Sequence, residues 1–350
     1  MELAELLLTM HQNKASDLIL KVDSPPLVRI DGEIVPLDME RLKPVDALNI
    51  MKNIADEKQL SVFKEKKVVD IAFTIPELAR FRVNIFRQRK NIGLVFRLIP
   101  LQIPKIEELN LPKILTDLVL RPRGLVILTG PSGCGKSFTI AGMIEYRNQN
   151  KECHIVTIED PIEFVFKDEK ALINQREVGG DTLSYSRALK AVLRHDPDCI
   201  VISELKDLTT ISQTITAAET GHLVLTTLHT VGAVPTIERL IDVFPGHQQQ
   251  QVRMQISANL IGVITQVLVK KKGGGRIPAF EILISTAAIR NLIREGKTHQ
   301  INSLIQTGHK SGMILLNQSL AQLVKSNVVS TDDALSVSPD RTQLRSLIGA

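Results

Sequence analysis

The chain has 350 residues, of which 43% are hydrophobic and 23% are charged, and its net charge is +5. This length predicts two or three domains, and the composition supplies enough apolar side chains for ordinary cores. The three cysteines, Cys134, Cys153 and Cys199, form no C-x-x-C pair. That spacing argues against a disulfide framework or a structural zinc, and for a reducing compartment. Acidic residues stand near the N-terminus where a signal peptide carries basic ones, and no apolar run reaches the length of a membrane span. We therefore expect a cytoplasmic protein that meets membranes only through partners.

The first hundred residues predict a small α+β domain. Helical spacing of apolar residues predicts one helix over residues 2–13 and two more within 43–66. Asp31-Gly32 is a hairpin signal between two strands. The expected strands are 17–22, 27–30, 68–73, 80–86 and 92–99. Pro100 and Pro104 then mark a linker, so we expect an N-terminal domain at 1–99 and a linker at 100–110.

Residues 111–350 predict a second domain in which strands and helices alternate. The expected strands are 125–129, 154–158, 199–203 and 222–227, separated by helices at 137–149, 184–195 and 208–220. This alternation predicts a mainly parallel sheet with helices on both faces, so the fold class is α/β. Beyond residue 247 we expect mostly helix. The segments are a long helix at 248–269, a strand at 277–284, and helices at 286–295, 299–307 and 313–327 that complete the chain.

The clearest motif is Gly130-Pro131-Ser132-Gly133-Cys134-Gly135-Lys136-Ser137, which fits G-x-x-x-x-G-K-[ST]. An apolar strand leads into it and a helical pattern leads out. Glycines let backbone N–H groups converge on a phosphate, and the helix N-terminus adds its dipole. Lys136 is expected to reach the β- and γ-phosphates, and the Ser137 hydroxyl to hold Mg²⁺. The sequence therefore predicts a nucleotide site.

Polar residues follow the other expected strands, where a parallel sheet binds its ligands. Glu159-Asp160-Pro161-Ile162-Glu163 could bind Mg²⁺ through water or orient an attacking water, or could be a solvated turn. Glu204 ends an apolar strand, as the metal- or water-directing acid of a P-loop protein does, or it caps the next helix. His222 and His229 bracket one strand. Either could be an ordinary core histidine, and His229 is the better placed to sense a γ-phosphate.

Several sequence blocks together resemble one family, the hexameric secretion and type IV pilus ATPases, and within it the retraction branch. The blocks are Ala15–Leu18, Arg80–Asn84, Thr157–Glu163, Asn174–Val178, Ala217–His222, Thr227–His229 and Ala288–Arg294. They occur in the family's order and cover nearly the whole chain. The resemblance implies a PAS-like N-terminal domain joined to a RecA-like ATPase domain, assembled as a homohexamer that uses ATP and Mg²⁺.

The resemblance also implies roles for individual residues. Arg82 and Arg97 would reach the nucleotide of a neighbouring subunit, Glu163 and Glu204 would be the catalytic acids, and His222 and His229 the paired histidines. Mg²⁺ would be held by Ser137, Glu163 and Glu204. The nucleotide-binding residues would be Gly130, Ser132, Gly133, Cys134, Gly135, Lys136, Ser137 and Phe138. Because Cys134 lies beside Lys136 and a helix N-terminus, we expect its thiol pKa to be lowered and its alkylation to block nucleotide binding.

The implied function is ATP-driven retraction of type IV pili, with pilin leaving the fibre base at the inner membrane through a membrane platform protein and with a second retraction ATPase as a possible partner. Departures from the family pattern leave one alternative open: His195, Ser203 and Lys206 replace the usual Glu, Gly and Arg, as in an accessory subunit with weak ATPase activity. A RecA-like nucleic-acid translocase is the other alternative. The mild net charge and scarcity of aromatic residues speak against direct nucleic-acid binding.

Overall fold

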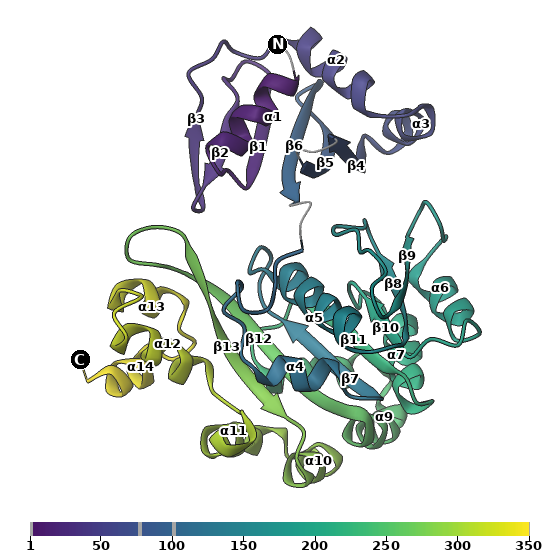
Figure 1. The fold of residues 1–350 in the computed structure, drawn as a ribbon, viewed down its shortest axis with the longest axis vertical. Helices are drawn as coiled ribbons and strands as arrows, with labels where there is room; N and C mark the ends of the chain where they lie inside the picture. The colour runs from purple at the N-terminus through teal and green to yellow at the C-terminus, as the bar shows by residue number, and fades with distance from the viewer. Residues whose placement is uncertain (1–2, 76–78, 100–102, 350) are drawn as a thin grey trace. The chain divides into compact units, whose positions relative to one another are not determined.

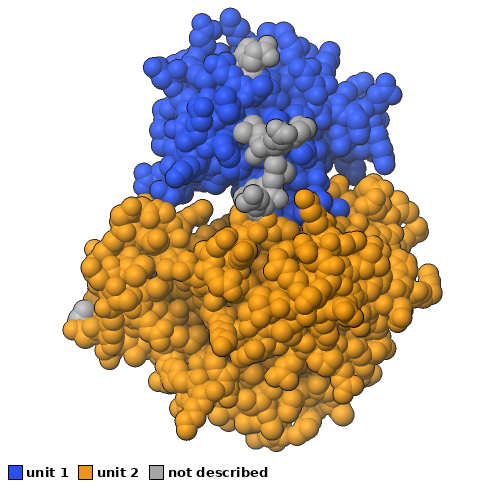
Figure 2. Space-filling model, viewed as in Figure 1, with its two compact units in different colours: residues 1–102, 161–165 blue, residues 103–160, 166–350 orange. Residues whose placement is uncertain are grey.

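The computed structural model describes residues 3–75, 79–99 and 103–349. The chain forms two compact units, one made of residues 1–102 and 161–165 and the other of residues 103–160 and 166–350 (Figure 2). The expected division at 1–99, 100–110 and 111–350 stays a prediction, since residues 100–102 of the linker lie outside the described residues. No helix within the described ranges is long and apolar enough to cross a membrane.

The first unit is a six-stranded antiparallel sheet in the order β3-β2-β1-β6-β5-β4 (Figure 1). Its strands are β1 Asp17–Lys21, β2 Leu27–Ile30, β3 Glu33–Pro36, β4 Val68–Ile75, β5 Ala79–Gln88 and β6 Asn91–Ile99. Its helices α1 Leu3–Gln12, α2 Pro44–Ile54 and α3 Glu57–Lys66 share one apolar core with the sheet. Strict alternation governs β5, where Phe81, Val83 and Ile85 are buried while the side chains between them are half-buried. Arg82 therefore faces away from the core, and it pairs directly with Arg97 of β6.

The second unit contains a seven-stranded sheet in the order β13-β12-β7-β11-β10-β8-β9. Every neighbouring pair is parallel except β12 with β13. The strands are β7 Gly124–Thr129, β8 His154–Glu159, β9 Leu172–Glu177, β10 Cys199–Ile202, β11 Leu223–Leu228, β12 Leu260–Lys270 and β13 Arg276–Ile284. All residues of β7, β10 and β11 are buried, as continuous apolar runs in a parallel sheet should be. The predicted α/β fold is confirmed.

Helices cover both faces of this sheet. One face packs against α4 Ile114–Val119 and α5 Lys136–Asn150. The other packs against α6 Tyr185–Val192, α7 Leu208–Glu219, α8 Ala233–Asp242, α9 Gly246–Asn259, α10 Ala287–Arg294 and α11 Ile301–Thr307. The end of the β12–β13 pair packs against α12 Leu316–Lys325, α13 Thr331–Val337 and α14 Arg341–Ile348. Two short 3₁₀ turns, Thr298–Gln300 and His309–Ser311, complete the described elements of this region.

Two expectations about the C-terminal region are wrong. The helix expected over 248–269 ends at Asn259, and the rest is the strand β12. Five of its residues are β-branched aliphatics, and it lies between β7 and β13, so burial in the sheet overrides the helical spacing. The chain also continues beyond 327 in two more helices, α13 and α14. The strand β9 and the helices α4 and α8 were not expected.

Candidate nucleotide-binding site

The G-x-x-x-x-G-K-S motif forms a loop between β7, which ends at Thr129, and α5, which begins at Lys136. Gly130, Gly133 and Gly135 have φ of 141°, 77° and 90°, which L side chains rarely adopt. Within the loop Ser132 and Gly133 are exposed, while Ser137 and Phe138 are half-buried in the first turn of α5. The loop therefore presents backbone N–H groups ahead of a helix N-terminus, which is the arrangement that holds phosphates.

Lys136 lies across this loop and is 8% exposed. Its ammonium donates to the backbone oxygens of Gly130 at 2.7 Å and Pro131 at 3.1 Å. It also lies 3.4 Å from His229 Nδ1. A lysine ammonium has only donors, so the Nδ1 that faces it must carry the lone pair. The proton of the neutral imidazole is then on Nε2.

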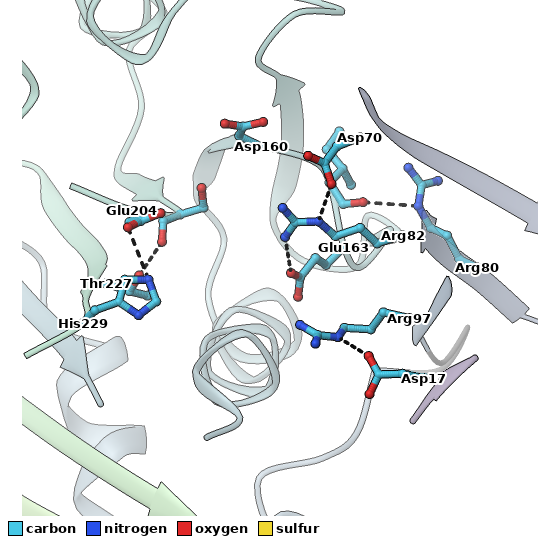
Figure 3. A network of polar contacts seen from close by, with 12 residues as sticks. Asp17, Asp70, Arg80, Arg82, Arg97, Asp160, Glu163, Glu204, Thr227 and His229 are labelled. Atoms are coloured by element: carbon cyan, nitrogen blue, oxygen red, sulfur yellow. Dashed lines mark hydrogen bonds and ion pairs between the residues drawn. The ribbon is translucent and has the colours of Figure 1, made fainter. Parts of the chain in front are cut away.

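His229 connects the P-loop lysine to a carboxylate at the end of the neighbouring strand. Its Nε2 lies 3.2 Å from Glu204 Oε1 (Figure 3). β10 and β11 are parallel neighbours; His229 directly follows β11, and Glu204 follows β10 after one residue, Ser203. The segment is held locally because the Thr227 hydroxyl donates to the Ser203 backbone oxygen and Leu205 N donates to the Thr227 oxygen at 3.2 Å. The structure thus brings together three predicted site residues, Lys136, Glu204 and His229.

The acidic segment after β8 divides between different partners. Glu159 accepts hydrogen bonds from Thr157 Oγ1 at 2.7 Å and Gln175 Nε2 at 3.0 Å, which turn it toward the sheet. Asp160 forms an ion pair with Lys206 at 3.0 Å, and Lys206 lies 3.8 Å from Glu204. Asp160 rather than Glu159 therefore joins the charged group around Glu204.

Glu163 belongs to the first compact unit, with the rest of residues 161–165. Its carboxylate lies 3.7 Å from Arg82 Nη1, and the Arg82 Nε lies 3.7 Å from Asp70 (Figure 3). Arg97 donates to Asp17 at 2.9 Å. Both predicted arginines thus share one face of the first sheet, each beside at least one carboxylate. Their role toward a neighbouring subunit's nucleotide stays a prediction.

The structure places His222 away from His229. His222 precedes β11 and His229 follows it, and a six-residue strand separates them by about 20 Å. The His222 Nδ1 lies 2.9 Å from the Ala217 backbone oxygen and 3.2 Å from Thr220 Oγ1, so it caps the end of α7. Within one chain His222 lies at the amino end of β11, whereas the P-loop lies at the carboxyl ends of the strands. The catalytic role of His222 stays a prediction.

The expected lowering of the Cys134 thiol pKa is wrong. The side chain is 3% exposed, and burial raises its pKa more than the charge of Lys136 and the backbone N–H groups of Lys136 and Cys134 lower it. The thiol points into the interior below the loop, where Sγ would lie 2.8 Å from a Cβ at Gly130. Sequence proximity to a cation was thus outweighed by desolvation.

Sequence reasoning missed two side chains that contact the P-loop region. Gln266 of β12 and Thr139 of α5 are buried and hydrogen-bonded to each other at 2.6 Å. A single amide inside the apolar run Leu260–Val269 was the available signal. It was overlooked because that run was expected to be helical.

The P-loop connects a strand of the parallel sheet to a helix, and Lys136, His229 and Glu204 meet at the carboxyl ends of the strands. This arrangement is that of a P-loop ATPase. Residues 39–334 match the family model described as "Type II/IV secretion system protein". The chain therefore belongs to the type II/IV secretion system protein family.

Individual relatives agree with this assignment. The type IV pilus retractation ATPase PilT of Pseudomonas aeruginosa is 47% identical over 95% of this chain and 97% of its own. The twitching motility protein of Neisseria gonorrhoeae is 44% identical over 88% and 83%. The type IV pilus ATPase PilU of P. aeruginosa is 38% identical over 99% and 91%. A crystal structure of the pilus retraction motor PilT with bound ADP matches with a TM-score of 0.88 and 45% identity over 99% of both chains. The resemblance expected from the motifs is confirmed, and the chain is a nucleotide-binding ATPase.

Proposed function

We propose that this chain is an ATP-hydrolysing motor that drives type IV pilus retraction and twitching motility. The proposal rests on one observation above all: the chain is similar to a retraction ATPase over 95% of its length, and it has a Lys136–His229–Glu204 contact at its P-loop. The motor is a homohexamer that acts at the inner membrane through a platform protein. The proposed domains are 1–99 and 111–350, joined by a linker at 100–110.

Nucleotide binding changes the contacts of Lys136 first. Its ammonium exchanges the Gly130 and Pro131 carbonyls for β- and γ-phosphate oxygens, which also draws it from His229. The Nε2 proton keeps His229 on Glu204, and Glu204 orients the attacking water for in-line displacement. The Ser137 hydroxyl and the Glu204 carboxylate are hard oxygen donors that suit Mg²⁺, which neutralises phosphate charge when bound.

Arginines of the first unit complete the site of a neighbouring subunit in this proposal. Arg82 and Arg97 stand opposite each other on adjacent strands, so their guanidinium groups project from one face as a pair. Guanidinium groups stay charged and bind phosphate oxygens in a fork. Engagement of phosphate draws them from Asp70, Glu163 and Asp17. ATP thereby ties one subunit to the next, and hydrolysis releases the tie.

The decisive experiment is deletion of the gene followed by measurement of twitching and surface piliation. We expect hyperpiliated cells that do not twitch, restoration by the wild-type gene, and no restoration by Lys136→Ala. Normal retraction in the deletion strain would contradict the motor proposal.

A second candidate, suggested by the similarity to PilU, is an accessory retraction subunit with weak ATPase activity. Turnover by the purified ring alone distinguishes the two. The accessory role is supported if the purified ring does not hydrolyse ATP and the protein increases retraction only in cells that contain a second retraction ATPase. Stimulation by single-stranded DNA would instead favour a translocase.

A further inference from the structure

The Gln266 side chain lies directly beneath the phosphate loop. It projects from β12 and is 3% exposed. Its Nε2 donates to the Cys134 backbone oxygen at 2.6 Å, and its Oε1 accepts from the Thr139 hydroxyl at 2.6 Å. The Cys134 carbonyl can only accept, so it fixes which end of the amide carries the NH₂ group. Both ends of one buried amide are thus used by the loop and by the first turn of α5.

Two glycines of the loop, Gly130 and Gly135, also lie close to Gln266. A Cβ at Gly130 would lie 2.1 Å from the Gln266 backbone oxygen, and a Cβ at Gly135 would lie 2.9 Å from its Nε2. Gln266 therefore contacts the loop at three places: at Gly130, at the backbone oxygen of Cys134, and at Gly135. β12 is an interior strand paired with β7 and β13, which makes it a rigid support.

The bond to Cys134 determines the direction of one peptide plane. In a trans peptide the N–H of Gly135 points opposite to the C=O of Cys134. Because Gln266 holds that carbonyl beneath the loop, the Gly135 N–H is turned away from β12 and toward the phosphate side. Without Gln266 the plane can rotate and present an oxygen to the phosphate, which repels it.

We propose that Gln266, held by Thr139, is a positioning residue that keeps the Cys134–Gly135 peptide oriented for phosphate binding. The inference rests on the proposed nucleotide site and adds a residue outside the G-x-x-x-x-G-K-S motif to it. Gln266 acts on the phosphates through the loop and touches no reacting atom. Its loss weakens ground-state and transition-state binding alike, so KM rises while kcat at saturating ATP stays nearly constant.

The test compares ADP affinity by calorimetry, and KM and kcat for ATP, in the purified full-length chain. Gln266→Met keeps the length of the side chain and removes both bonds. We expect its ADP Kd and its KM for ATP to rise about tenfold or more, as loss of a charge-assisted hydrogen bond to phosphate requires. Thr139→Val removes only the hydrogen bond to Gln266 Oε1, and we expect the ADP Kd to rise about threefold. Thr139→Ser keeps that hydroxyl and should have the wild-type Kd.

Thr214→Val is the matched control. Thr214 is also fully buried, and its hydroxyl donates to the Thr210 backbone oxygen at 2.7 Å on α7, which packs on the other face of the sheet. It should lower the melting temperature without changing Kd. An unchanged Kd in Gln266→Met, or an equal rise in Thr214→Val and Thr139→Val, overturns the inference. If Gln266→Met does not fold, the Thr139 pair decides by the same criterion. Failure of the wild type to bind ADP would instead refute the nucleotide site itself.

Discussion

Glu281 offers a sharp test because one buried carboxylate serves the starts of two helices. It lies on β13 and is 8% exposed. It accepts the backbone N–H of Ala233, the first residue of α8, at 2.7 Å, and that of Leu316, the first residue of α12. Both donors belong to buried residues. Glu281→Ala leaves two buried N–H groups unsatisfied, at about 1–3 kcal/mol each, so we expect a loss of roughly 2–6 kcal/mol in the free energy of unfolding.

Glu281→Gln separates the hydrogen bonds from the charge. It keeps one acceptor oxygen, so its cost is about 1–3 kcal/mol where the wild-type carboxyl is protonated. Burial raises the pKa of Glu281, against the lowering effect of the Ala233 and Leu316 N–H groups. The native carboxyl therefore binds its proton more tightly than the unfolded one. This contribution is fully present below the ordinary value of 4.5 and is lost as pH rises through the raised pKa.

The advantage of wild type over Glu281→Gln should therefore shrink as pH rises above 4.5. The chain has no tryptophan, so urea unfolding is best followed by far-UV circular dichroism. Glu108→Gln is the control, since Glu108 accepts a backbone N–H from Lys105 at 3.2 Å but is exposed. Parallel pH curves for wild type and Glu281→Gln, or an alanine variant no less stable than the glutamine variant, would refute this reasoning.

Three further predictions concern the nucleotide site. Since burial raises the thiol pKa of Cys134 above 9.0, less than about 3% is thiolate at pH 7.5, so half-buried Cys153 should react first with iodoacetamide; peptide mass mapping that finds Cys134 modified first contradicts this. Lys136→Met should weaken ADP binding at least about tenfold while circular dichroism stays unchanged; calorimetry showing wild-type affinity would exclude contact with phosphate. Glu204→Gln should lower kcat by a factor of about 10²–10⁴ and change the ADP Kd by no more than about threefold. Steady-state turnover near the wild-type rate would show that Glu204 is not catalytic, even if its contact with His229 is kept.

Features with a local physical cause could be predicted from the sequence. The phosphate loop depends on glycines that adopt positive φ and on the strand and helix beside them, all within about twenty residues. Glu204 and His229 come together because parallel strands end at one edge.

Features that depend on distant packing could not be predicted. The Cys134 thiol is buried by its place below the loop, beside β12, more than a hundred residues later in the chain. Residues 246–259 are helical, and the helix expected over 248–269 wrongly extends this helix into the residues that form β12. That error concealed Gln266, whose contacts only become meaningful once β12 lies beside β7.

Ser203 and Lys206, two of the three departures from the family pattern, are neighbours in space, which bears on whether the site is weakened. The Ser203 hydroxyl bonds the Tyr185 hydroxyl at 2.6 Å, and the Lys206 ammonium lies 5.6 Å from the centre of the Tyr185 ring. Lys206 also contacts both Asp160 and Glu204. Burial raises the pKa of the Tyr185 phenol, so it stays protonated and can donate to Ser203. A lysine cannot form the forked contact of an arginine. Here the Lys206 ammonium nevertheless contacts the carboxylates of Asp160 and Glu204 while it lies near the Tyr185 ring, and Ser203 is hydrogen-bonded to the hydroxyl of that tyrosine. Ser203, Tyr185 and Lys206 thus form one connected group beside Glu204, so the lysine at position 206 still places a positive charge next to that carboxylate.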